Sequence, residues 1–481
     1  MSHPRSQAAR PAVRTRQPAA AASVLSGSPA AVTGGLARLL LSAAPTAVVA
    51  YAGSAADAAA ASAIARRAHA PLLLMSGRAA TGTEESRIRS AIRALAPRAL
   101  ITVGVDGRAL VAGLPGTKLV AMSRALTPAV NGRPLRGVTV LVRASSPATG
   151  SATAIAAATT AEAAGARVIY LPSFDLQTDP AAISELAATR PQRVIAVGSR
   201  FGPVSLLAYR LAVAETGVQL PGGGQVLFPM RRIVALYGSP GTAALGALGQ
   251  QGLAASIARA RAVARKYAAI SRIPVIPAFE IIATIAQGSP GRNGTYSYES
   301  SVRALRPWIR AAAKAGLYVT LDLQPGRASF LTQAKHYRSL LMLPDVGLAL
   351  DPEWKLGPRQ LPLRQIGSVG IGEVNSVVSW LARLTARYRL PQKLLELHEF
   401  RLTMIRGISR LDTRHGDLAV VINMDGQGAP RTKQQTWAAV VAGAPHGVFF
   451  GWKDFYVKDT PMLGPRATLR HRPEPVLISY Q

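Results

Sequence analysis

The second half of the chain is built from apolar, strand-like runs that end in carboxylate residues, and this pattern constrains the fold most. Eight such runs follow residue 232, and a helix-like stretch comes after each of them. Acids stand at the ends of seven runs: Glu280, Asp322, the pair Asp351 and Glu353, Glu373, Glu399, Asp425 and Asp454. Eight strands alternating with helices predict a (β/α)8 TIM-like barrel over residues 231–481. Because parallel strands point their carboxyl ends to one face, the acids should share one mouth.

The ring of acids has a structural and a functional interpretation. An Asp or Glu that follows a strand often caps the next helix, and this explains any single member equally well. A ring made only of caps is less plausible, because like charges a few Å apart repel by about 4 kcal/mol at an effective dielectric near 20. We therefore predict an active site. Its catalytic candidates are Asp351, Glu353, Glu280, Asp322, Glu399 and Asp425.

Length and composition bound the remaining possibilities. A chain of 481 residues is expected to form two domains, and the absence of cysteine excludes disulfides, thiolate metal sites and a Cys nucleophile. The net charge of +32 suits an anionic partner such as nucleic acid, an acidic membrane or a wall polymer. However, the arginines are scattered through Ala-rich helices, as a GC-rich genome alone would produce. No basic block with interleaved aromatics occurs, so nucleic acid is not an expected partner.

The first 40 residues are predicted to be a disordered or targeting segment, because residues 1–35 are rich in Ala, Arg, Pro, Ser and Gly without periodicity. The run LLLSAAPTAVVAYAG after Arg38 has two interpretations. It is either the apolar core of a secretion signal cleaved at Ala50-Tyr51-Ala52, or a helix end followed by a buried strand. No run of about 18 uninterrupted apolar residues exists, so no transmembrane segment is expected.

Residues 41–230 show short β-branched strands that alternate with Ala-rich helices, which indicates parallel sheet covered by helices on both faces. Residues 92–107 and 186–202 each run helix, Pro-containing turn, strand and Gly, which suggests an internal duplication. The predicted strands are Thr46–Ala52, Pro71–Met75, Ala99–Gly104, Lys118–Ala121, Gly137–Arg143, Ala166–Leu171, Arg193–Gly198 and Gln225–Phe228.

One part of this region follows a known family pattern. In VVAYAGSAADAAAASAIARRAHAPLLLM a strand ends at Gly53, Asp57 and Ala58 open an Ala-rich helix, and further strands follow at Ala70–Leu74 and Ile101–Gly104. Residues 46–110 thereby resemble the actinobacterial and clostridial cell wall-binding repeat 2 family. The resemblance implies attachment to an anionic wall polymer, and therefore an extracellular or wall location.

The fourth run of the predicted barrel carries two carboxylates one residue apart, Asp351 and Glu353. Side chains two positions apart on an extended segment point the same way. A shared proton raises the pKa of one while the other stays ionised, as a general acid beside an electrostatic stabiliser requires. Arg327, after the third run, is expected to neutralise an acid or hold an anionic substrate, and the loop GSPGRNG (288–294) to act as a lid.

The sequence VGLALDPEW places Gly347, Asp351 and Glu353 at positions of the fourth-strand signature of family 18 chitinase-like glycoside hydrolases, which this run resembles. The resemblance implies that Glu353 protonates the glycosidic oxygen and Asp351 orients an N-acetyl group acting as internal nucleophile. It also implies that Trp452 lies under the sugar ring. An independent hypothesis pairs Glu353 with Glu399 or Asp425, where about 5 Å between the carboxyl groups predicts retention and 6.5–9.5 Å inversion.

Aromatic residues at run ends suit a carbohydrate cleft, because flat rings stack on sugars. They are Tyr237, Phe279, Trp354, Phe400, Trp452 and Phe455, of which Phe279 and Phe400 are better explained by packing. The residues expected to bind substrate are Tyr237, Arg327, Trp354, Trp452 and Asp454.

A metal site is the weaker alternative. The ligand types are suitable in Asp322, Asp351, Glu353, Asp425 and His398. No fixed ligand spacing such as HExxH occurs, and only one of the neighbours His398 and Glu399 can face the mouth easily, so neither a metal nor another cofactor is expected. The tail RHRPEPVLISYQ is expected to pack outside the barrel.

The sequence thus predicts an envelope protein whose barrel resembles glycoside hydrolases and acts on a wall polysaccharide. One alternative is a non-catalytic wall- or carbohydrate-binding protein. The other is a cytoplasmic barrel enzyme acting on a phosphorylated metabolite. Substrate identity and oligomeric state do not follow from the sequence.

Overall fold

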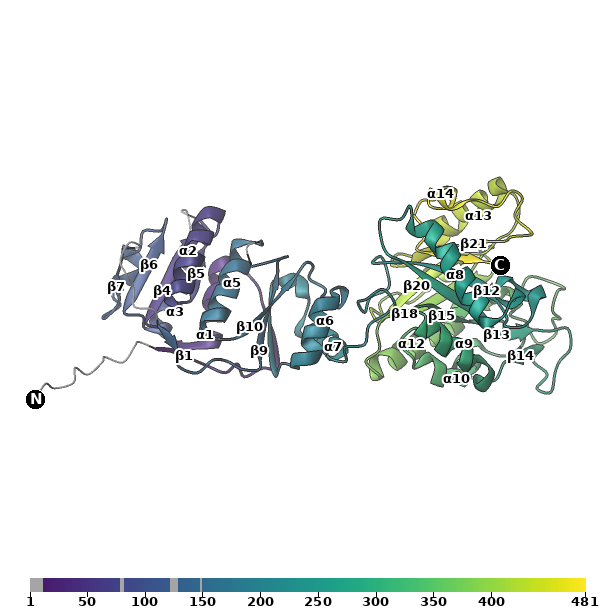
Figure 1. Cartoon of the computed structure of the whole chain (residues 1–481), viewed down its shortest axis with the longest axis horizontal. Helices are drawn as coiled ribbons and strands as arrows, with labels where there is room; N and C mark the ends of the chain where they lie inside the picture. Colours follow the sequence, from purple (N-terminus) through teal and green to yellow (C-terminus); the bar gives the residue numbers. More distant parts are fainter. Residues whose placement is uncertain (1–11, 78–81, 122–128, 148) are drawn as a thin grey trace, which may run out of the picture. The chain divides into compact units, whose positions relative to one another are not determined.

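The structure, a computed structural model, describes residues 12–77, 82–121, 129–147 and 149–481 (Figure 1). Two compact units make up the chain, residues 1–217 and residues 218–481. Both consist of parallel β-sheet with helices packed on it. Among the described residues, no helix has the length and apolar character needed to cross a membrane.

The first unit contains two four-stranded parallel sheets, as the alternation of strands and helices predicted. One sheet has the order β5 (Leu72–Met75), β4 (Thr46–Tyr51), β6 (Ala99–Val103) and β7 (Lys118–Leu119). The other has the order β10 (Arg167–Leu171), β9 (Val138–Arg143), β11 (Arg193–Val197) and β2 (Ala22–Leu25). The helices are α1 (Pro29–Leu40), α2 (Ala55–Ala68), α3 (Gly82–Leu95), α4 (Arg108–Val111), α5 (Ala152–Ala163), α6 (Pro180–Thr189) and α7 (Val204–Ala214).

The expected disorder of residues 1–35 is wrong from residue 12 onward. Strand β1 (Ala12–Thr15) pairs with β3 (Leu41–Ala43) and β8 (Val130–Asn131), and β2 pairs with β11. Helix α1 buries Leu36, Ala37 and Leu40 completely, because its small residues allow close packing inside the unit. Residues 1–11 lie outside the described ranges. In LLLSAAPTAVVAYAG the structure has the helix end and then β4, which is buried from Thr46 to Ala50.

The second unit is a closed barrel of eight parallel strands, in agreement with the predicted TIM-like fold. The strands are β12 (Arg232–Gly238), β13 (Val275–Ala286), β15 (Tyr318–Leu323), β16 (Val346–Leu350), β18 (Lys393–His398), β20 (Leu418–Met424), β21 (Phe449–Asp454) and β22 (Leu477–Tyr480). Around them lie α8 (Leu253–Ala268), α9 (Val302–Lys314), α10 (Phe330–His336), α11 (Arg338–Leu341), α12 (Ile371–Arg387), α13 (Pro430–Gly443) and α14 (Pro465–Thr468) (Figure 1). A short strand, β14 (Ser297–Glu299), pairs with the end of β13.

Three predicted elements of this half are corrected. The fifth run provides only β17 (Val369–Gly370), which pairs with β19 (Ile405–Arg406) outside the barrel, and Glu373 lies in the first turn of α12 because the apolar spacing after it is helical. The tail, expected outside, forms β22 and closes the barrel between β21 and β12. The predicted strand Gln225–Phe228 is a loop whose apolar side chains fill the N-terminal end of the barrel.

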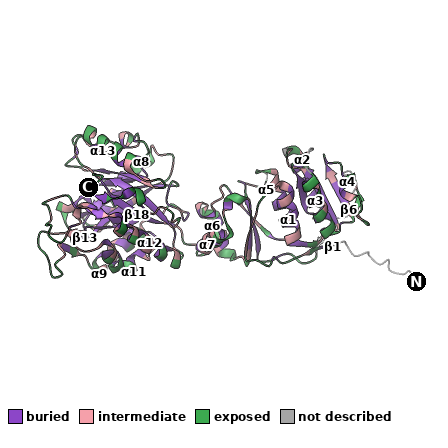
Figure 2. Cartoon of the chain, turned by 180° about the vertical axis from the view of Figure 1, so that it is seen from behind, coloured by how far each residue is buried: buried purple, intermediate pink, exposed green. Residues whose placement is uncertain are grey.

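The barrel strands are buried on both faces (Figure 2). Outward side chains form one large apolar core with the helices, as Phe450 and Trp452 do on β21. Inward side chains are apolar near the N-terminal ends of the strands, where Leu394 and Leu477 lie. Nearer the carboxyl ends they are polar and charged, as Glu396 and Lys453 are. Along each strand, the inward side chains therefore change from an apolar core at the N-terminal end to polar groups that can form a site at the carboxyl end.

Candidate functional site

The carboxyl ends of the barrel strands surround a cavity of about 620 Å³. Its charged lining residues include Glu353, Asp425, Lys453 and Arg401. Its aromatic lining residues are Tyr237, Trp354, Phe400 and Phe455. An apolar pocket with a few convergent polar groups is the usual form of a ligand site. This cavity lies where the sequence predicted the mouth.

The acids of the cavity floor come from two strand ends, those of β16 and β20, which lie on either side of β18. Asp351 follows β16, Glu353 lies in the single turn Pro352–Trp354, and Asp425 follows β20. Each of these three carboxylates offers an oxygen within 4.8 Å of the other two. Asp351 is 1% exposed, whereas Glu353 is partly exposed to the cavity. Glu353 is therefore the member of this group that a substrate would meet.

One imidazole ring lies beneath the floor with carboxylates on both sides. The Nε2 atom of His398 is 2.9 Å from Glu280 Oε1 and 3.6 Å from Glu396 Oε1. The same atom is 3.8 Å from Asp322 Oδ1, and Nδ1 is 3.0 Å from Asp425 Oδ2. Side chains from β13, β15, β18 and the end of β20 thus meet at the barrel axis, as strand direction predicted for the acids.

Hydrogen bonds hold this inner layer in place. Tyr237 donates its hydroxyl proton to Asp322 Oδ2 at 3.0 Å, and Gln324 Nε2 donates to the Tyr237 hydroxyl oxygen at 3.1 Å. Lys453 Nζ lies 3.4 Å from the centroid of the Tyr237 ring, a cation–π contact inside the barrel. These contacts fix the ring of Tyr237 between the inner layer and the cavity.

Burial shifts the protonation of the acids. It raises the pKa of Glu353 to about 7, with a further contribution from Asp425, and the pKa of Asp322 to about 6. Burial also raises the pKa of Glu396 to about 8, and burial together with Glu353 raises the pKa of Asp351 well above its ordinary value. These acids therefore hold protons at higher pH than exposed carboxyls do.

The pKa values of the two basic side chains of the layer are also raised, but by neighbouring carboxylates and against the effect of burial. Burial alone would lower the pKa of His398, but Asp425 and Glu280 outweigh it and raise that pKa well above its usual range. Burial is likewise outweighed at Lys453, whose pKa is raised by Glu280 and Asp425 among others. Fixed positive charge thus lies beside the carboxylates of the floor.

Two predicted binding residues, Trp452 and Asp454, lie behind the barrel wall. The Trp452 ring packs 5.8 Å from that of Trp437 on α13 and 4.0 Å from that of His471. Its Nε1 donates a hydrogen bond of 2.7 Å to Asp454. Alternation along β21 turns Lys453 inward and these two residues outward, so the expected place of Trp452 under a sugar ring is corrected.

Glu399 and Arg327 also do not line the cavity. Glu399 follows His398 in the chain and is buried without lining the cavity, and burial raises its pKa to about 7. The Arg327 guanidinium lies 4.4 Å from the Tyr296 ring centroid and donates to the backbone oxygen of Gln360 at 3.0 Å. Arg327 thus holds two loops together.

Of the remaining predictions, the packing role of Phe279 agrees with the structure, whereas those for Phe400 and for the loop 288–294 do not. Phe279 packs against Trp308 of α9 at 6.0 Å between ring centroids, as expected for a packing residue. Phe400 lines the cavity instead of packing away from it. No residue of the predicted lid, 288–294, is among the lining residues of that cavity.

Sequence reasoning missed Glu396, Lys453, Gln324 and Asn423. Asn423 Nδ2 donates to Glu396 Oε1 at 2.6 Å, so these two residues belong to the inner layer. The available signal was a charged residue inside an apolar strand, as in LLELH and VFFGWKD. Such a residue must face a polar interior or carry a large desolvation cost.

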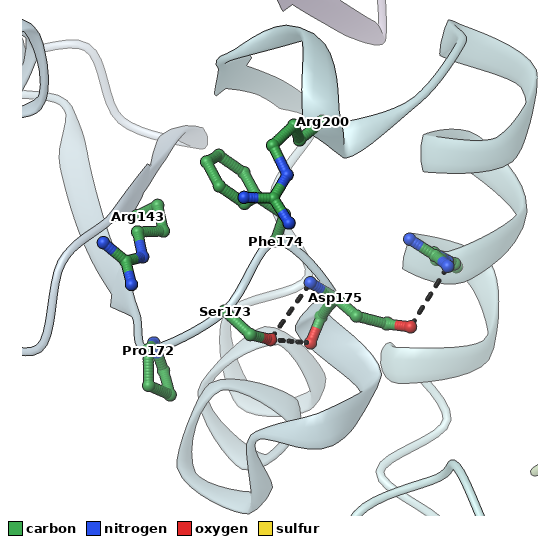
Figure 3. Close-up of a pocket in the computed structure, with 7 residues that line it drawn as sticks. Arg143, Pro172, Ser173, Phe174, Asp175 and Arg200 are labelled. Carbon is green, nitrogen blue, oxygen red and sulfur yellow. Dashed lines mark hydrogen bonds and ion pairs between the residues drawn. The ribbon is translucent and has the colours of Figure 1, made fainter. Parts of the chain in front are cut away.

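The first unit has a basic crevice at the carboxyl ends of β9, β10 and β11. A cavity of about 380 Å³ is lined by Arg143, Pro172, Ser173, Phe174, Asp175, Arg200 and Arg210 (Figure 3). Arg210 pairs with Asp175 at 3.1 Å, and Arg200 lies 4.9 Å from the Phe174 ring centroid. A second cavity of about 340 Å³ shares Arg143, Phe174 and Arg200. Open parallel sheets bind ligands at such strand ends, and arginine suits an anion.

Comparisons with known proteins give no relative. No protein-family model, no curated protein and no solved structure matches this chain. The likeness to wall-binding repeats and to family 18 hydrolases therefore stays a prediction, and a function is inferred from the chemistry of the chain's own residues.

Proposed function

We propose that the barrel mouth hydrolyses glycosidic bonds of a polysaccharide, with Glu353 as the general acid. The observation that carries this proposal is the position of Glu353 on the cavity lining, with a pKa raised to about 7 by burial and by Asp425. A general acid works best when its pKa lies near the working pH. Trp354 and Phe455 line the same cavity and provide faces on which sugar rings can stack.

The proposed reaction uses two carboxyl groups. Glu353 donates its proton to the leaving glycosidic oxygen, while Asp425 acts on the anomeric carbon as nucleophile or through a water. The two groups have oxygens within 4.8 Å of each other, which favours the short separation of retaining enzymes, about 5 Å, over the 6.5–9.5 Å of inverting ones. Asp351 is buried beside Glu353, and burial together with Glu353 raises the pKa of Asp351 well above its ordinary value. Lys453 supplies positive charge next to these acids.

We propose a wall polysaccharide as the substrate and an extracellular or wall location for the protein. The basic crevice of the first unit supports this, because Arg143 and Arg200 suit an anionic wall polymer. The same crevice favours a second candidate function, in which the protein binds the wall without hydrolysing it. A phosphorylated metabolite is less well supported as substrate, since the floor of the mouth carries carboxylates that repel phosphate.

The test replaces the proton donor and measures turnover of purified wall glycans. Glu353→Gln should lower kcat by about 1,000-fold, within the range for loss of a general acid. In the unmodified protein kcat should fall as the pH rises through about 7, where Glu353 loses its proton.

Glu399→Gln is the matched control, because Glu399 is a buried acid outside the cavity, and its turnover should stay within a few-fold of the parent. Unchanged turnover in Glu353→Gln would remove Glu353 from the mechanism. Absence of turnover in the parent protein would leave only the binding function.

A further inference from the structure

Three side chains of metal-ligand type converge inside the barrel, below the mouth. Glu280 comes from β13, and Glu396 and His398 come from β18. Each offers a ligand atom within 4.8 Å of the other two. Their side chains are at most 1% exposed. The group is therefore sealed from solvent, and it adjoins the acids of the cavity floor where His398 Nδ1 lies 3.0 Å from Asp425 Oδ2.

Most polar atoms of this group have no hydrogen-bond partner among the described residues. This holds for both carboxylate oxygens of Glu280, for Oε2 of Glu396 and for both ring nitrogens of His398. The 2.9 Å approach of His398 Nε2 to Glu280 is thus an ion-pair distance without hydrogen-bond direction. An unsatisfied buried polar atom costs about 1–3 kcal/mol, and more when charged. A ligand bound by these atoms would remove that cost.

The excess of carboxylates in the barrel interior also favours binding of a cation. Carboxylates outnumber basic groups in the barrel interior, with Glu280, Asp322, Glu396, Asp351 and Asp425 on one side and His398 and Lys453 on the other. Like charges about 4 Å apart repel by roughly 4 kcal/mol at an effective dielectric near 20. A divalent ion bound there would replace the proton of His398, whose ring ligates a metal only when neutral, and would add one net positive charge at the centre of these acids.

The surroundings orient the three side chains as the outer partners of a metal site do. Asp425 Oδ2 lies 3.0 Å from His398 Nδ1, so the other ring nitrogen, Nε2, is turned toward the two glutamates. Asn423 donates to Glu396 Oε1 at 2.6 Å and leaves Oε2 unpartnered. A carboxylate behind a ligating histidine orients the ring, and here it acts by charge at 3.0 Å because Nδ1 makes no hydrogen bond to any residue that the structure describes.

We propose that Glu280, Glu396 and His398 bind one divalent transition-metal ion, Zn²⁺ or Mn²⁺. An imidazole beside two carboxylates suits these ions better than Mg²⁺ or Ca²⁺, which prefer oxygen ligands alone. Bonds of about 2.0–2.2 Å place tetrahedral ligand atoms roughly 3.4 Å apart. His398 Nε2 and Glu280 Oε1, now 2.9 Å apart, would therefore move slightly apart to admit the ion. Asp322 Oδ1, 3.8 Å from His398 Nε2, is placed to complete the coordination.

The test measures bound metal in the full-length protein. The protein is unfolded with a chelator, refolded with or without ZnCl2 or MnCl2, desalted and analysed for metal by mass spectrometry. The expected result is one ion per chain, with a higher Tm than the metal-free protein. Failure to retain an ion after refolding with either metal would overturn the proposal.

The metal affinities of substituted proteins show where the ion binds. Glu396→Gln should weaken binding by more than about 100-fold, and Asn423→Ser, which alters only the orienting partner, by about 10-fold. Glu399→Gln, the same change on the next buried glutamate of the segment, should bind like the parent. Equal affinity in parent and Glu396→Gln would place the ion elsewhere and overturn the assignment. If Glu396→Gln does not fold, the metal affinity of Asn423→Ser is compared with the parent instead. Equal affinity would again overturn the assignment.

The metal proposal and the hydrolase proposal can be tested separately, although Asp425 takes part in both. Bound metal is measured without substrate, and Glu353→Gln should retain the ion while it loses turnover. A protein that binds metal but does not cleave glycans would contradict only the hydrolase proposal. A protein that cleaves glycans without any ion would contradict only the metal site.

Discussion

The two units carry candidate sites at the same place, the carboxyl ends of parallel strands, yet the sites differ in charge and in exposure. The crevice of the first unit lies on an open sheet and is lined by Arg143 and Arg200, both exposed. The site of the second unit lies inside a closed barrel and is built from buried acids. Closure excludes water, so the barrel can shift pKa values and the crevice can only attract opposite charge.

The largest effect is expected from reopening the barrel. Removal of residues 476–481 deletes β22 and exposes the edges of β12 and β21. The second unit should lose its cooperative unfolding transition, while the first unit keeps its own. Urea unfolding followed by circular dichroism, with limited proteolysis, would show this as a resistant fragment from the first unit. Two intact transitions would mean that closure by β22 is dispensable.

The next effect concerns the buried positive charge. Lys453→Met should lower the free energy of unfolding by about 3–5 kcal/mol at pH 8, because the neighbouring carboxylates lose a compensating charge. Much of this loss should be recovered at pH 5, where Asp322 and Glu353, with pKa values of about 6 and 7, take up protons. Lys458→Met, at an exposed lysine, should change stability by less than about 0.5 kcal/mol. Equal losses at both pH values would contradict this account of Lys453.

A smaller and opposite effect is expected for Glu353. Its ordinary pKa is 4.5 and its pKa in the fold is about 7, so the folded state binds the proton more tightly. The protein therefore loses stability as the pH rises from about 4.5 to about 7. Glu353→Gln cannot ionise and should be more stable than the parent by about 1–3 kcal/mol at pH 8, and equal to it near pH 4.

Urea unfolding at the two pH values, with chelator present, measures this difference. A variant that is less stable than the parent at pH 8 would show that Glu353 has a structural rather than a chemical role.

The smallest effect on stability is expected from substitutions in the crevice of the first unit. Arg143→Ala combined with Arg200→Ala should leave the free energy of unfolding within about 0.5 kcal/mol of the parent, because both side chains are exposed. Binding of a poly(glycerol phosphate) probe should weaken by about 10-fold at low salt, since two charge-assisted contacts are lost. Calorimetric titration measures the affinity for this probe. Arg431→Ala, at an exposed arginine of the other unit, is the control. Equal loss in the control would indicate general charge attraction.

Much of the fold was predictable because most strands of the barrel are short apolar runs between polar turns. The exceptions have a physical cause. The run after Val369 continues with the spacing of a helix, so it forms α12 rather than a strand. Residues 12–40 are rich in Ala and Gly, a composition shared by disordered segments and by tightly packed helices. Local pattern alone does not distinguish these cases.

The sequence predicted which acids form the candidate site. It did not predict which side chains of a strand point into the barrel. Glu280, Asp322, Glu353 and Asp425 meet as strand direction predicted. Trp452 and Lys453 are adjacent on β21, and the sequence does not say which one faces inward, because both faces of a barrel strand are buried.

The amino-acid sequence by itself determined that parallel strands carry acids at their carboxyl ends, since that depends only on the order of apolar and polar residues. The tertiary structure alone decided which side chains share the interior, because that depends on how strands from opposite sides of the barrel face one another. The contact between His398 of β18 and Glu280 of β13 is the clearest case. Closure by the last strand brings these groups out of water, and burial then sets their chemistry.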